Sequence, residues 1–318
     1  MIKSAHFQLT VRCNLHCSFC GQSRGMAGAA CGEMAPEKWL SIADELKDFA
    51  PENAEQEITL WGGEPTLYDG FGVLAEALKN RGFSLNVVTN ATNISKFRDE
   101  ICSFFDNIFV SLDGTEEMHD AVRGKGVFEK VRRNLPLLKE RSGKLTFLCT
   151  ISDINVNDAA GFPDKMAQLG CDEVVFQQLM YMSSEEIEKY RIYSRKHFGC
   201  DYAGLEGWQR DDDLSYRNSF EKLVNQVKSS AYAVPVQITP HAYWMNMDCR
   251  PCRVSGKRVH IRHDGELGFC TDYFGFSAGN IKNQTLNEIL NSSRYRLFFD
   301  AIENDQLPIC NHCPWRLQ

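Results

Sequence analysis

Cys13-Asn14-Leu15-His16-Cys17-Ser18-Phe19-Cys20 is the stretch of this 318-residue chain that decides its fold, because it follows a predicted strand at residues 6–11 with three closely spaced thiols. Iron–sulfur clusters usually take four cysteine ligands, so three close thiols leave one iron open to a substrate or cofactor. A bacterial ferredoxin run has a different spacing, with a proline after its last cysteine. Taken alone, the spacing also allows a zinc site or three cysteines buried by chance.

Short β-rich runs alternate with amphipathic helical stretches from residue 6 to about residue 178. Apolar residues recur in the helical stretches near the 3.6-residue period, as Trp39, Ile42, Ala43 and Leu46 do. Successive β-α units imply a parallel sheet, which right-handed crossovers curl in one direction. We therefore predict an α/β fold in which residues 1–180 form a partial (β/α)6 TIM-like barrel, with its chemistry at the carboxyl ends of the strands. The predicted strands span residues 6–11, 57–61, 84–89, 107–112, 145–151 and 173–178.

Polar and glycine-containing motifs follow three more of these strands. Two adjacent glycines let the backbone approach a ligand closely, and an ordinary strand-to-helix turn would need only one. The polar residues of the later motifs, taken singly, could also be ordinary turn residues. The motifs are Gly62-Gly63-Glu64-Pro65, Thr89-Asn90-Ala91 and Ser111-Leu112-Asp113-Gly114, the last followed by His119-Asp120-Ala121-Val122-Arg123-Gly124.

Together with the C-x3-C-x2-C run, these motifs resemble the signature of the radical S-adenosylmethionine (SAM) superfamily over residues 7–178. The resemblance implies that Cys13, Cys17 and Cys20 hold a 4Fe–4S cluster whose open iron chelates the amino and carboxylate groups of SAM. Reductive cleavage of SAM would give a 5′-deoxyadenosyl radical that abstracts a hydrogen from substrate carbon. In such an enzyme the cofactor carries the hard chemistry and the protein positions it.

The same resemblance assigns SAM contacts to residues outside the cysteines. It places Phe19 near the adenine and gives the SAM ammonium group to Glu64 or an adjacent carbonyl. It turns Ser111 and Asp113 toward the ribose or carboxylate of SAM, and it pairs that carboxylate with Arg123 or with Arg132. Ala91 departs from the family's Thr-Asn-Gly motif. The predicted cofactor-binding residues are Phe19, Gly62, Gly63, Glu64, Thr89, Asn90, Ser111, Asp113 and Arg123.

A second group of cysteines lies near the end of the chain. Twelve residues separate Cys252 from Gly265 and four separate Gly265 from Cys270, across a predicted hairpin at residues 258–270. This pattern resembles the opening of SPASM and twitch auxiliary domains, and a later C-x2-C pair resembles the closing ligands of the twitch form. The resemblance implies one auxiliary 4Fe–4S cluster in a small domain at residues 249–318. Its predicted ligands are Cys252, Cys270, Cys310 and Cys313.

Four-thiolate ligation favours electron transfer or a structural role for this second cluster. Cys249 is then spare, and it could also replace Cys252 as a ligand. A zinc ribbon is the alternative, but its cysteine pairs lie fifteen to twenty residues apart and Cys270 would have no role in it.

Composition limits the classes of partner. The 13 cysteines are an odd number in a long chain without a secretory h-region, which favours metal chemistry in the cytoplasm over a disulfide framework. No apolar run is long enough to span a membrane. The net charge of −7 gives no electrostatic footprint for nucleic acid.

Residues 181–248 interrupt the β-α rhythm and are predicted to connect the barrel to the auxiliary domain and to shape the substrate site. Cys200 could donate a hydrogen atom to a substrate radical, and Cys249 is the second candidate for a catalytic thiol. The alternative for both residues is a buried or unreactive cysteine without a catalytic role. The acidic residues 211–213 and residues 241–244 are further candidates, with solvated or packing roles as the alternatives.

By resemblance, relatives with this layout modify ribosomally made peptides or oxidise and rearrange small molecules such as aminocyclitols. The first strand begins near residue 6, so we expect no leader-binding domain before the barrel. We favour a peptide substrate, with a small molecule and a non-catalytic iron–sulfur carrier as alternatives. The expected electron donor is a flavodoxin or ferredoxin.

Overall fold

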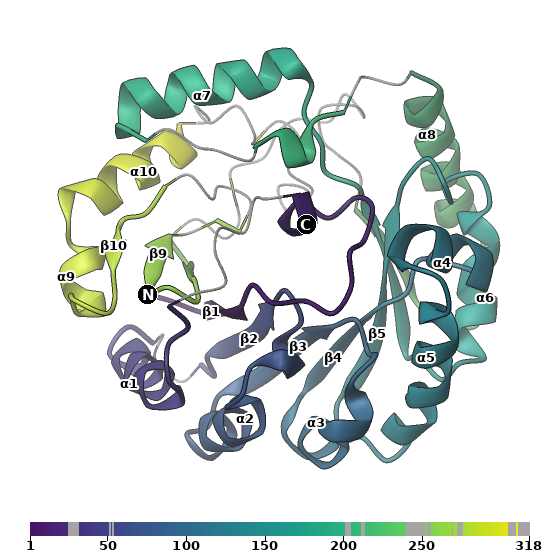
Figure 1. Ribbon diagram of the computed structural model, residues 1–318, viewed down its shortest axis with the longest axis horizontal. Helices are drawn as coiled ribbons and strands as arrows, with labels where there is room; N and C mark the ends of the chain where they lie inside the picture. The colour runs from purple at the N-terminus through teal and green to yellow at the C-terminus, as the bar shows by residue number, and fades with distance from the viewer. Residues whose placement is uncertain are drawn as a thin grey trace.

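The structure is a computed structural model that describes residues 1–24, 32–50, 52, 54–200, 205–210, 214–239, 252, 256–268, 270–271, 276–304 and 310. Its strands form one sheet with the order β10-β9-β8-β1-β2-β3-β4-β5-β6-β7, bent into an open arc (Figure 1). Strands β1 to β7 are parallel, and all six predicted strands are confirmed to within two residues. The strands are β1 (Ser4–Thr10), β2 (Glu57–Gly62), β3 (Ser84–Thr89), β4 (Asn107–Ser111), β5 (Lys144–Ile151), β6 (Glu173–Gln178), β7 (Val236–Thr239), β8 (Arg258–Ile261), β9 (Glu266–Gly268) and β10 (Gly279–Asn280).

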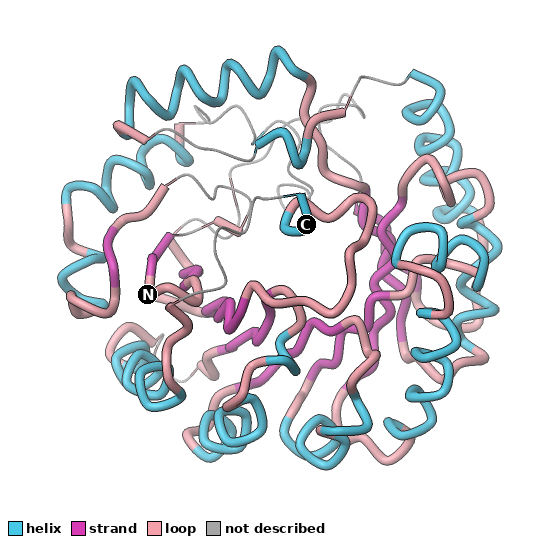
Figure 2. Tube along the Cα trace, viewed as in Figure 1, coloured by secondary structure: helices cyan, strands magenta, loops and turns pink. Residues whose placement is uncertain are grey.

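Helices cover the convex face of the arc, and α7, α9 and α10 lie on its open side (Figures 1 and 2). The stretch predicted as one helix at residues 285–303 is two helices, because Ser292 caps a new helix by accepting a hydrogen bond from the Tyr295 backbone. None of the helices in the described ranges is long and apolar enough to cross a membrane. The helices are α1 (Pro36–Lys47), α2 (Phe71–Asn80), α3 (Arg98–Phe104), α4 (Glu116–Arg123), α5 (Val127–Asn134), α6 (Phe162–Ala167), α7 (Ser184–Phe198), α8 (Leu214–Ser229), α9 (Leu286–Leu290) and α10 (Ser293–Glu303).

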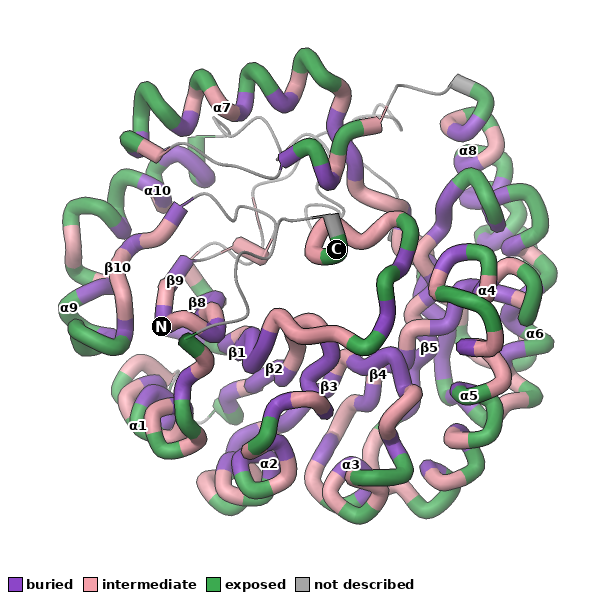
Figure 3. The backbone as a smooth tube through the Cα atoms, viewed as in Figure 1, coloured by how far each residue is buried: buried purple, intermediate pink, exposed green. Residues whose placement is uncertain are grey.

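The main core lies between the sheet and the outer helices, where the buried colour follows the strands and the inward faces of the helices (Figure 3). The predicted apolar face of α1 is buried along its whole length, and the ring of Trp39 packs 4.7 Å from that of Phe7 on β1. Alternate strand residues therefore point outward into this core, and the intervening residues point to the concave side.

The predicted hairpin at residues 258–270 is present, but it is joined to the barrel sheet. Strand β8 pairs in parallel with β1, in the register Ser4 to Arg258 through Phe7 to Ile261, and β9 and β10 extend the sheet from there. Gly265 turns the hairpin with a φ of +89°, where an added Cβ would lie 2.6 Å from the Asn280 side chain. Cys270, which follows β9, is therefore joined through β8 to β1, the strand that leads into the Cys13 run.

His260 of β8 is buried beside this junction, opposite His6 and 5.2 Å from the Trp61 ring. Burial lowers its pKa to about 3. An unfolded histidine takes up a proton near pH 6.5, so on acidification the unfolded state binds more protons and the free energy of unfolding falls. The expected loss between pH 7 and pH 5 is on the order of 2 kcal/mol from this residue.

Urea unfolding at both pH values tests this expectation. His260→Leu should remove that share of the acid-dependent loss, whereas His197→Asn, a change on the exposed surface of α7, should leave it as in the wild type. If the free energy of unfolding depends on pH equally in the wild type and in His260→Leu, the lowered pKa of His260 is not a cause of the acid-dependent loss.

Candidate active site

The loop that carries Cys13, Cys17 and Cys20 crosses the carboxyl ends of the strands and is bound to the end of β2. Gly63 donates its backbone N–H to Thr10 at 2.8 Å, and Glu64 donates to Arg12 at 2.8 Å. A Cβ on Gly62 would lie 2.3 Å from the Thr10 carbonyl, and one on Gly63 would lie 2.2 Å from the Arg12 carbonyl. The two glycines thus let the backbone approach the cysteine loop, rather than a ligand as the sequence suggested.

Glu64 is completely buried and ties β2 to β3. Its Oε1 accepts from the Thr66 hydroxyl and the Thr89 hydroxyl, each at 2.7 Å, and its Oε2 accepts from the Asn90 backbone at 2.8 Å. Burial raises the pKa of Glu64, and these hydrogen bonds oppose the shift. The prediction that Glu64 or an adjacent carbonyl receives the SAM ammonium stays a prediction.

Glu64→Gln is expected to destabilise the protein by about 1–3 kcal/mol, since the single oxygen of Gln cannot accept from both the Asn90 and the Thr66 backbone and one buried N–H is left unpaired. Urea unfolding measures the loss. Glu76→Gln, on the helix that follows, is the control for an ordinary Glu-to-Gln change. A Glu64→Gln variant as stable as the control would show that these hydrogen bonds do not hold the strand ends.

Asn90 connects the end of β3 to the first cysteine. Its Nδ2 donates to Asn14 Oδ1 at 2.9 Å and lies 3.9 Å from Cys13 Sγ. The next residue, Ala91, has a φ of +61°, which explains why glycine suits this position in the family motif. Thr89 and Asn90 were predicted to contact a cofactor, and in the structure their side chains bind Glu64 and the cysteine loop.

Asp113 and Arg123 form a buried ion pair beside Cys17. Arg123 Nε lies 2.5 Å from Asp113 Oδ2, and the two side chains are 9% and 0% exposed. Arg123 Nη1 also approaches Cys17 Sγ at 3.9 Å, and its guanidinium carbon lies 5.6 Å from the centre of the Phe19 ring. Burial alone would lower the pKa of Arg123, but Asp113 raises it above its usual value, so the guanidinium stays charged.

Asp113 was predicted to face SAM, and that contact stays a prediction; in the structure Asp113 supports Arg123. Its second oxygen, Oδ1, accepts from the Thr150 backbone at 2.8 Å, so both oxygens are engaged within the protein. The alternative arginine, Arg132, is half exposed and pairs with Glu129. Arg123 is therefore the arginine that the fold brings to the cysteines, and Asp113 holds it there.

Two buried residues that the sequence analysis missed position Asp113. His119 accepts a hydrogen bond from the Asp113 backbone at 3.1 Å, and burial lowers its pKa to about 4. Asn155 donates to the carbonyls of Asp113 and Thr150, at 3.0 and 2.9 Å. His119 lies within the quoted motif, but nothing local marked Asn155, which lies 42 residues from Asp113.

The three thiols fit the ligation of a 4Fe–4S cluster with one open iron. Burial raises the pKa of Cys17 to about 11, and Arg123 opposes this shift and so favours the thiolate that iron binding requires. Within the described residues, no three Cys, His, Asp or Glu side chains converge on a point where one ion could be held. Three cysteine thiolates are the ligand set that a 4Fe–4S cluster takes when one of its irons stays open.

A hollow of about 340 Å³ lies next to these cysteines. Ser18 and Phe19 line it from the cysteine loop, residues 152–154 and 179–181 from the ends of β5 and β6, and residues 207–210 from the opposite segment. Ser111 is the last residue of β4 and pairs with Leu148 of β5. Its predicted contact with SAM stays a prediction. The hollow lies at the carboxyl ends of parallel strands, where barrel folds place their chemistry.

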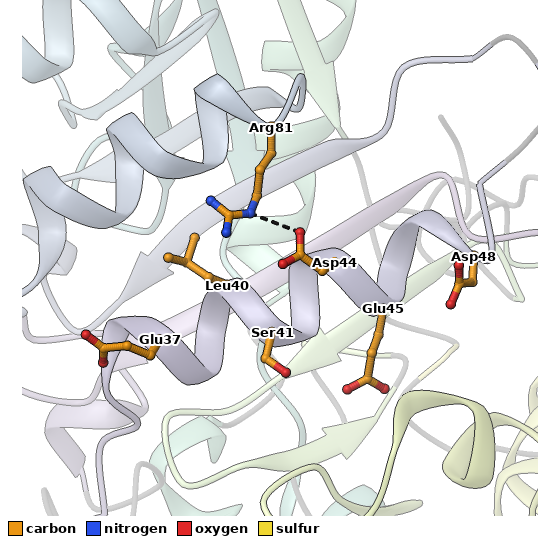
Figure 4. A pocket seen from close by; sticks show the side chains of 7 residues that line it. All are labelled: Glu37, Leu40, Ser41, Asp44, Glu45, Asp48 and Arg81. Carbon is orange, nitrogen blue, oxygen red and sulfur yellow. Dashed lines mark hydrogen bonds and ion pairs between the residues drawn. The ribbon is translucent and has the colours of Figure 1, made fainter.

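A larger hollow of about 640 Å³ lies elsewhere, on the outer surface of α1 (Figure 4). Glu37, Asp44, Glu45 and Asp48 project from the helix there, and Arg81 pairs with Asp44 at 2.9 Å. It contains none of the predicted site residues, and we regard it as a surface feature.

Cys252, Cys270 and Cys310 are half-buried on the C-terminal part of the chain, whereas Cys249 and Cys313 lie outside the described residues. Cys270 follows β9, and Cys310 follows α10. Burial, together with Cys310, raises the pKa of Tyr193 on α7. The predicted set of auxiliary ligands therefore stays a prediction.

Cys200 ends α7 against α10, where Arg294 Nη2 lies 3.3 Å from its sulfur. It does not line the hollow beside Phe19. Its predicted role as a hydrogen-atom donor to a substrate radical stays a prediction. The candidate residues 211–213 and 241–244, like Cys31, lie outside the described ranges.

Two family models match the chain. The model of the radical SAM superfamily matches residues 7–162, and the model of an iron–sulfur cluster-binding domain, SPASM, matches residues 252–314. The first range contains Cys13, Cys17, Cys20, the Glu64 network and the Asp113–Arg123 pair. The second contains Cys252, Cys270, Cys310 and Cys313.

Similar proteins extend these matches. The sporulation killing factor maturation protein SkfB of Bacillus subtilis is 25% identical over 74% of this chain, and the chain spans 60% of the length of SkfB. A cofactor-modifying protein for a tungsten-containing aldehyde ferredoxin oxidoreductase of Pyrococcus furiosus is 23% identical over 99% of this chain and 88% of its own length. The crystal structure of Streptococcus suis SuiB bound to its precursor peptide SuiA has a TM-score of 0.70 at 14% identity, covers 99% of this chain and 71% of SuiB, and shows a shared fold.

Proposed function

The chain belongs to the radical SAM superfamily and has a SPASM domain, which imply SAM, a SAM-binding 4Fe–4S cluster and an auxiliary 4Fe–4S cluster, and we propose that it modifies a ribosomally made peptide. The proposed change is an oxidation, cross-link or epimerisation that begins with abstraction of a hydrogen from carbon. When bound, SAM and its reduced cluster supply the 5′-deoxyadenosyl radical for that abstraction.

The observation that carries the proposal is the contact between Arg123 and the cysteine loop. A permanently charged guanidinium lies beside Cys17 and over Phe19, held by a carboxylate that is itself fully buried. Arginine binds carboxylates with strong charge-assisted hydrogen bonds, and Arg123 still has nitrogens besides the Nε that pairs with Asp113. It is therefore placed to bind the carboxylate of SAM, while Cys13, Cys17 and Cys20 hold the cluster.

The surrounding residues keep this arrangement rigid. Glu64 and Asn90 fix the loop near Cys13, and Asn155 and His119 fix the backbone of Asp113. Positions held by buried hydrogen bonds reorganise little on binding, which is how a protein positions a cofactor with precision. Phe19 then presents an aromatic face at the hollow, where the adenosine part of SAM is proposed to bind.

The relatives favour a peptide substrate. SkfB is named for the maturation of a killing factor, and SuiB is seen with a precursor peptide. Residues 181–248, which lie between the two matched models, are proposed to shape the substrate site. A small-molecule substrate is the second candidate, favoured by the cofactor-modifying protein of Pyrococcus furiosus, which aligns with 99% of this chain.

The auxiliary cluster is proposed to accept the electron that remains on an oxidised substrate. A flavodoxin or ferredoxin is the proposed reductant of the SAM-binding cluster, since reductive cleavage of SAM needs an external electron.

The test is anaerobic incubation of the reconstituted protein with SAM, dithionite and each small peptide that the neighbouring genes encode, followed by mass spectrometry. We expect 5′-deoxyadenosine together with a peptide that has lost hydrogen or has exchanged hydrogen with deuterated solvent. Formation of 5′-deoxyadenosine with an unchanged peptide would overturn the peptide proposal and favour the small molecule. If no 5′-deoxyadenosine forms under any condition, the enzyme proposal is overturned and a non-catalytic iron–sulfur carrier is favoured.

A further inference from the structure

Residues 205–210, called here the strap, form one wall of the hollow beside Phe19. The strap runs parallel to the segment after β6: Met182 donates its N–H to the Trp208 carbonyl at 2.9 Å, and Arg210 donates to the Met182 carbonyl at 2.9 Å. Trp208 and Arg210 both line the hollow, together with Ser18 and Phe19 from the cysteine loop.

Arg210 fastens the strap to the end of β5. Its Nη2 lies 2.5 Å from Asp153 Oδ1, and its guanidinium carbon lies 5.6 Å from the centre of the Tyr216 ring. Tyr216 is itself anchored, because its hydroxyl donates to the Ile151 carbonyl at 2.7 Å. The ion pair therefore connects two walls of the hollow that are 57 positions apart in sequence.

The strap belongs to neither matched family model, since these end at residue 162 and begin again at residue 252. Phe19 and Asp153 belong to the first model. One side of the hollow is thus built from family residues, and the other from a segment that the family models do not describe.

We propose that the strap covers the adenosine end of bound SAM, with Trp208 against the base and the Asp153–Arg210 ion pair holding the strap in place. This inference rests on the proposed function. Phe19 lies between Cys17 and Cys20, so a ligand with its amino-acid end at the thiols extends into this hollow. Its volume of about 340 Å³ lies near the lower limit of small-molecule pockets, which suits a nucleoside better than an extended peptide.

Trp208 contributes a flat aromatic surface, and removing an aromatic ring that stacks on a base typically weakens binding by about tenfold or more. Arg210 acts through the strap and is a positioning residue. Trp208→Ala is therefore expected to raise the Kd for SAM about tenfold, and Arg210→Gln and Asp153→Asn to raise it about threefold each. The double variant should be no weaker than the weaker single variant, because both changes break the same pair.

Isothermal titration of SAM into the reconstituted protein, without reductant so that no cleavage occurs, measures these affinities. A second readout is tryptophan fluorescence during titration with 5′-deoxyadenosine. We expect quenching in the wild type and little quenching in Trp208→Phe, which should keep most of the SAM affinity. This conservative variant keeps the inference testable should Trp208→Ala fold poorly.

Arg81→Gln is the matched control for Arg210→Gln. The Arg81 and Asp44 side chains are 31% and 54% exposed, against 27% and 55% for Arg210 and Asp153. Asp44 lies on α1 and Arg81 follows α2, and neither residue lines the hollow beside Phe19. The control should bind SAM like the wild type. Wild-type affinity in Arg210→Gln, or unchanged quenching in Trp208→Phe, would overturn the inference and leave the proposed function intact. A wild-type protein that binds no SAM would instead overturn the proposed function.

Discussion

Replacing Cys13, Cys17 and Cys20 together with alanine is expected to halve the iron content of the reconstituted protein, from about eight to about four irons per chain, and to abolish SAM cleavage. The three thiols are the only protein ligands available to the SAM-binding cluster in this proposal, and the Arg123 guanidinium beside Cys17 has no ligating role. Without that cluster no electron reaches SAM, so formation of 5′-deoxyadenosine should fall to background. Iron and sulfide analysis and chromatographic assay of 5′-deoxyadenosine measure the two outcomes.

Cys102→Ala with Cys171→Ala is the control, because both thiols are buried in the core away from the site. Free cysteine is a common core residue, and its truncation to alanine removes little apolar surface. This double variant should keep its iron and its SAM cleavage. Zinc in the triple variant would mean that one of the two cysteine groups has been misassigned. So would equal formation of 5′-deoxyadenosine by the triple variant and the wild type.

Asp113→Ala should destabilise the folded protein by about 3–5 kcal/mol, because it leaves the Arg123 guanidinium buried without a counter-charge. Solvent screens the charge interaction between Asp113 and Arg123 only weakly, since neither side chain is more than 9% exposed. Urea unfolding of the protein under anaerobic conditions measures the loss, and SAM binding should weaken in the same variant because Arg123 is no longer held in place.

A double variant, Asp113→Ala with Arg123→Met, separates stability from function. Replacing both partners of a buried ion pair by apolar groups is often nearly neutral, so most of the stability should return, apart from the hydrogen bond from the Thr150 backbone. SAM affinity should not return, because Met cannot bind a carboxylate. A single variant that loses under about 1 kcal/mol would show that the pair is not the buried anchor inferred here.

Much of the barrel could be read from the chain because its signals are local. Each of the six predicted strands is a short apolar run, the first four are followed by a cysteine, glycine or polar motif, and all six are present in the parallel sheet. The three cysteines follow β1 directly, so their position at the carboxyl edge was fixed once β1 was recognised. Such periodicity and spacing do not depend on distant contacts.

Roles within the site could not be read in this way, because they depend on which direction each side chain points. The sequence offered Glu64 and Asp113 as ligands of SAM, and packing instead buries both and directs their oxygens to protein donors. It offered both Arg123 and Arg132, and only burial beside Cys17 distinguishes them. A sequence motif shows that a carboxylate is present, but the donors that bind the carboxylate lie on strands that meet only in the folded chain.

The sequence by itself therefore determined the three-thiol loop, the parallel α/β barrel and the chemistry they imply, since spacing and periodicity are properties of neighbouring residues. Only the tertiary structure decided that β8 pairs with β1, which attaches the C-terminal cysteines to the strand leading to Cys13. It alone brought Asp113 against Arg123 and Arg210 against Asp153. Two of these pairings join residues far apart in the chain, while Asp113 and Arg123 are ten positions apart and meet only in the folded protein. Each pairing satisfies backbone groups or charges that folding removes partly or wholly from water.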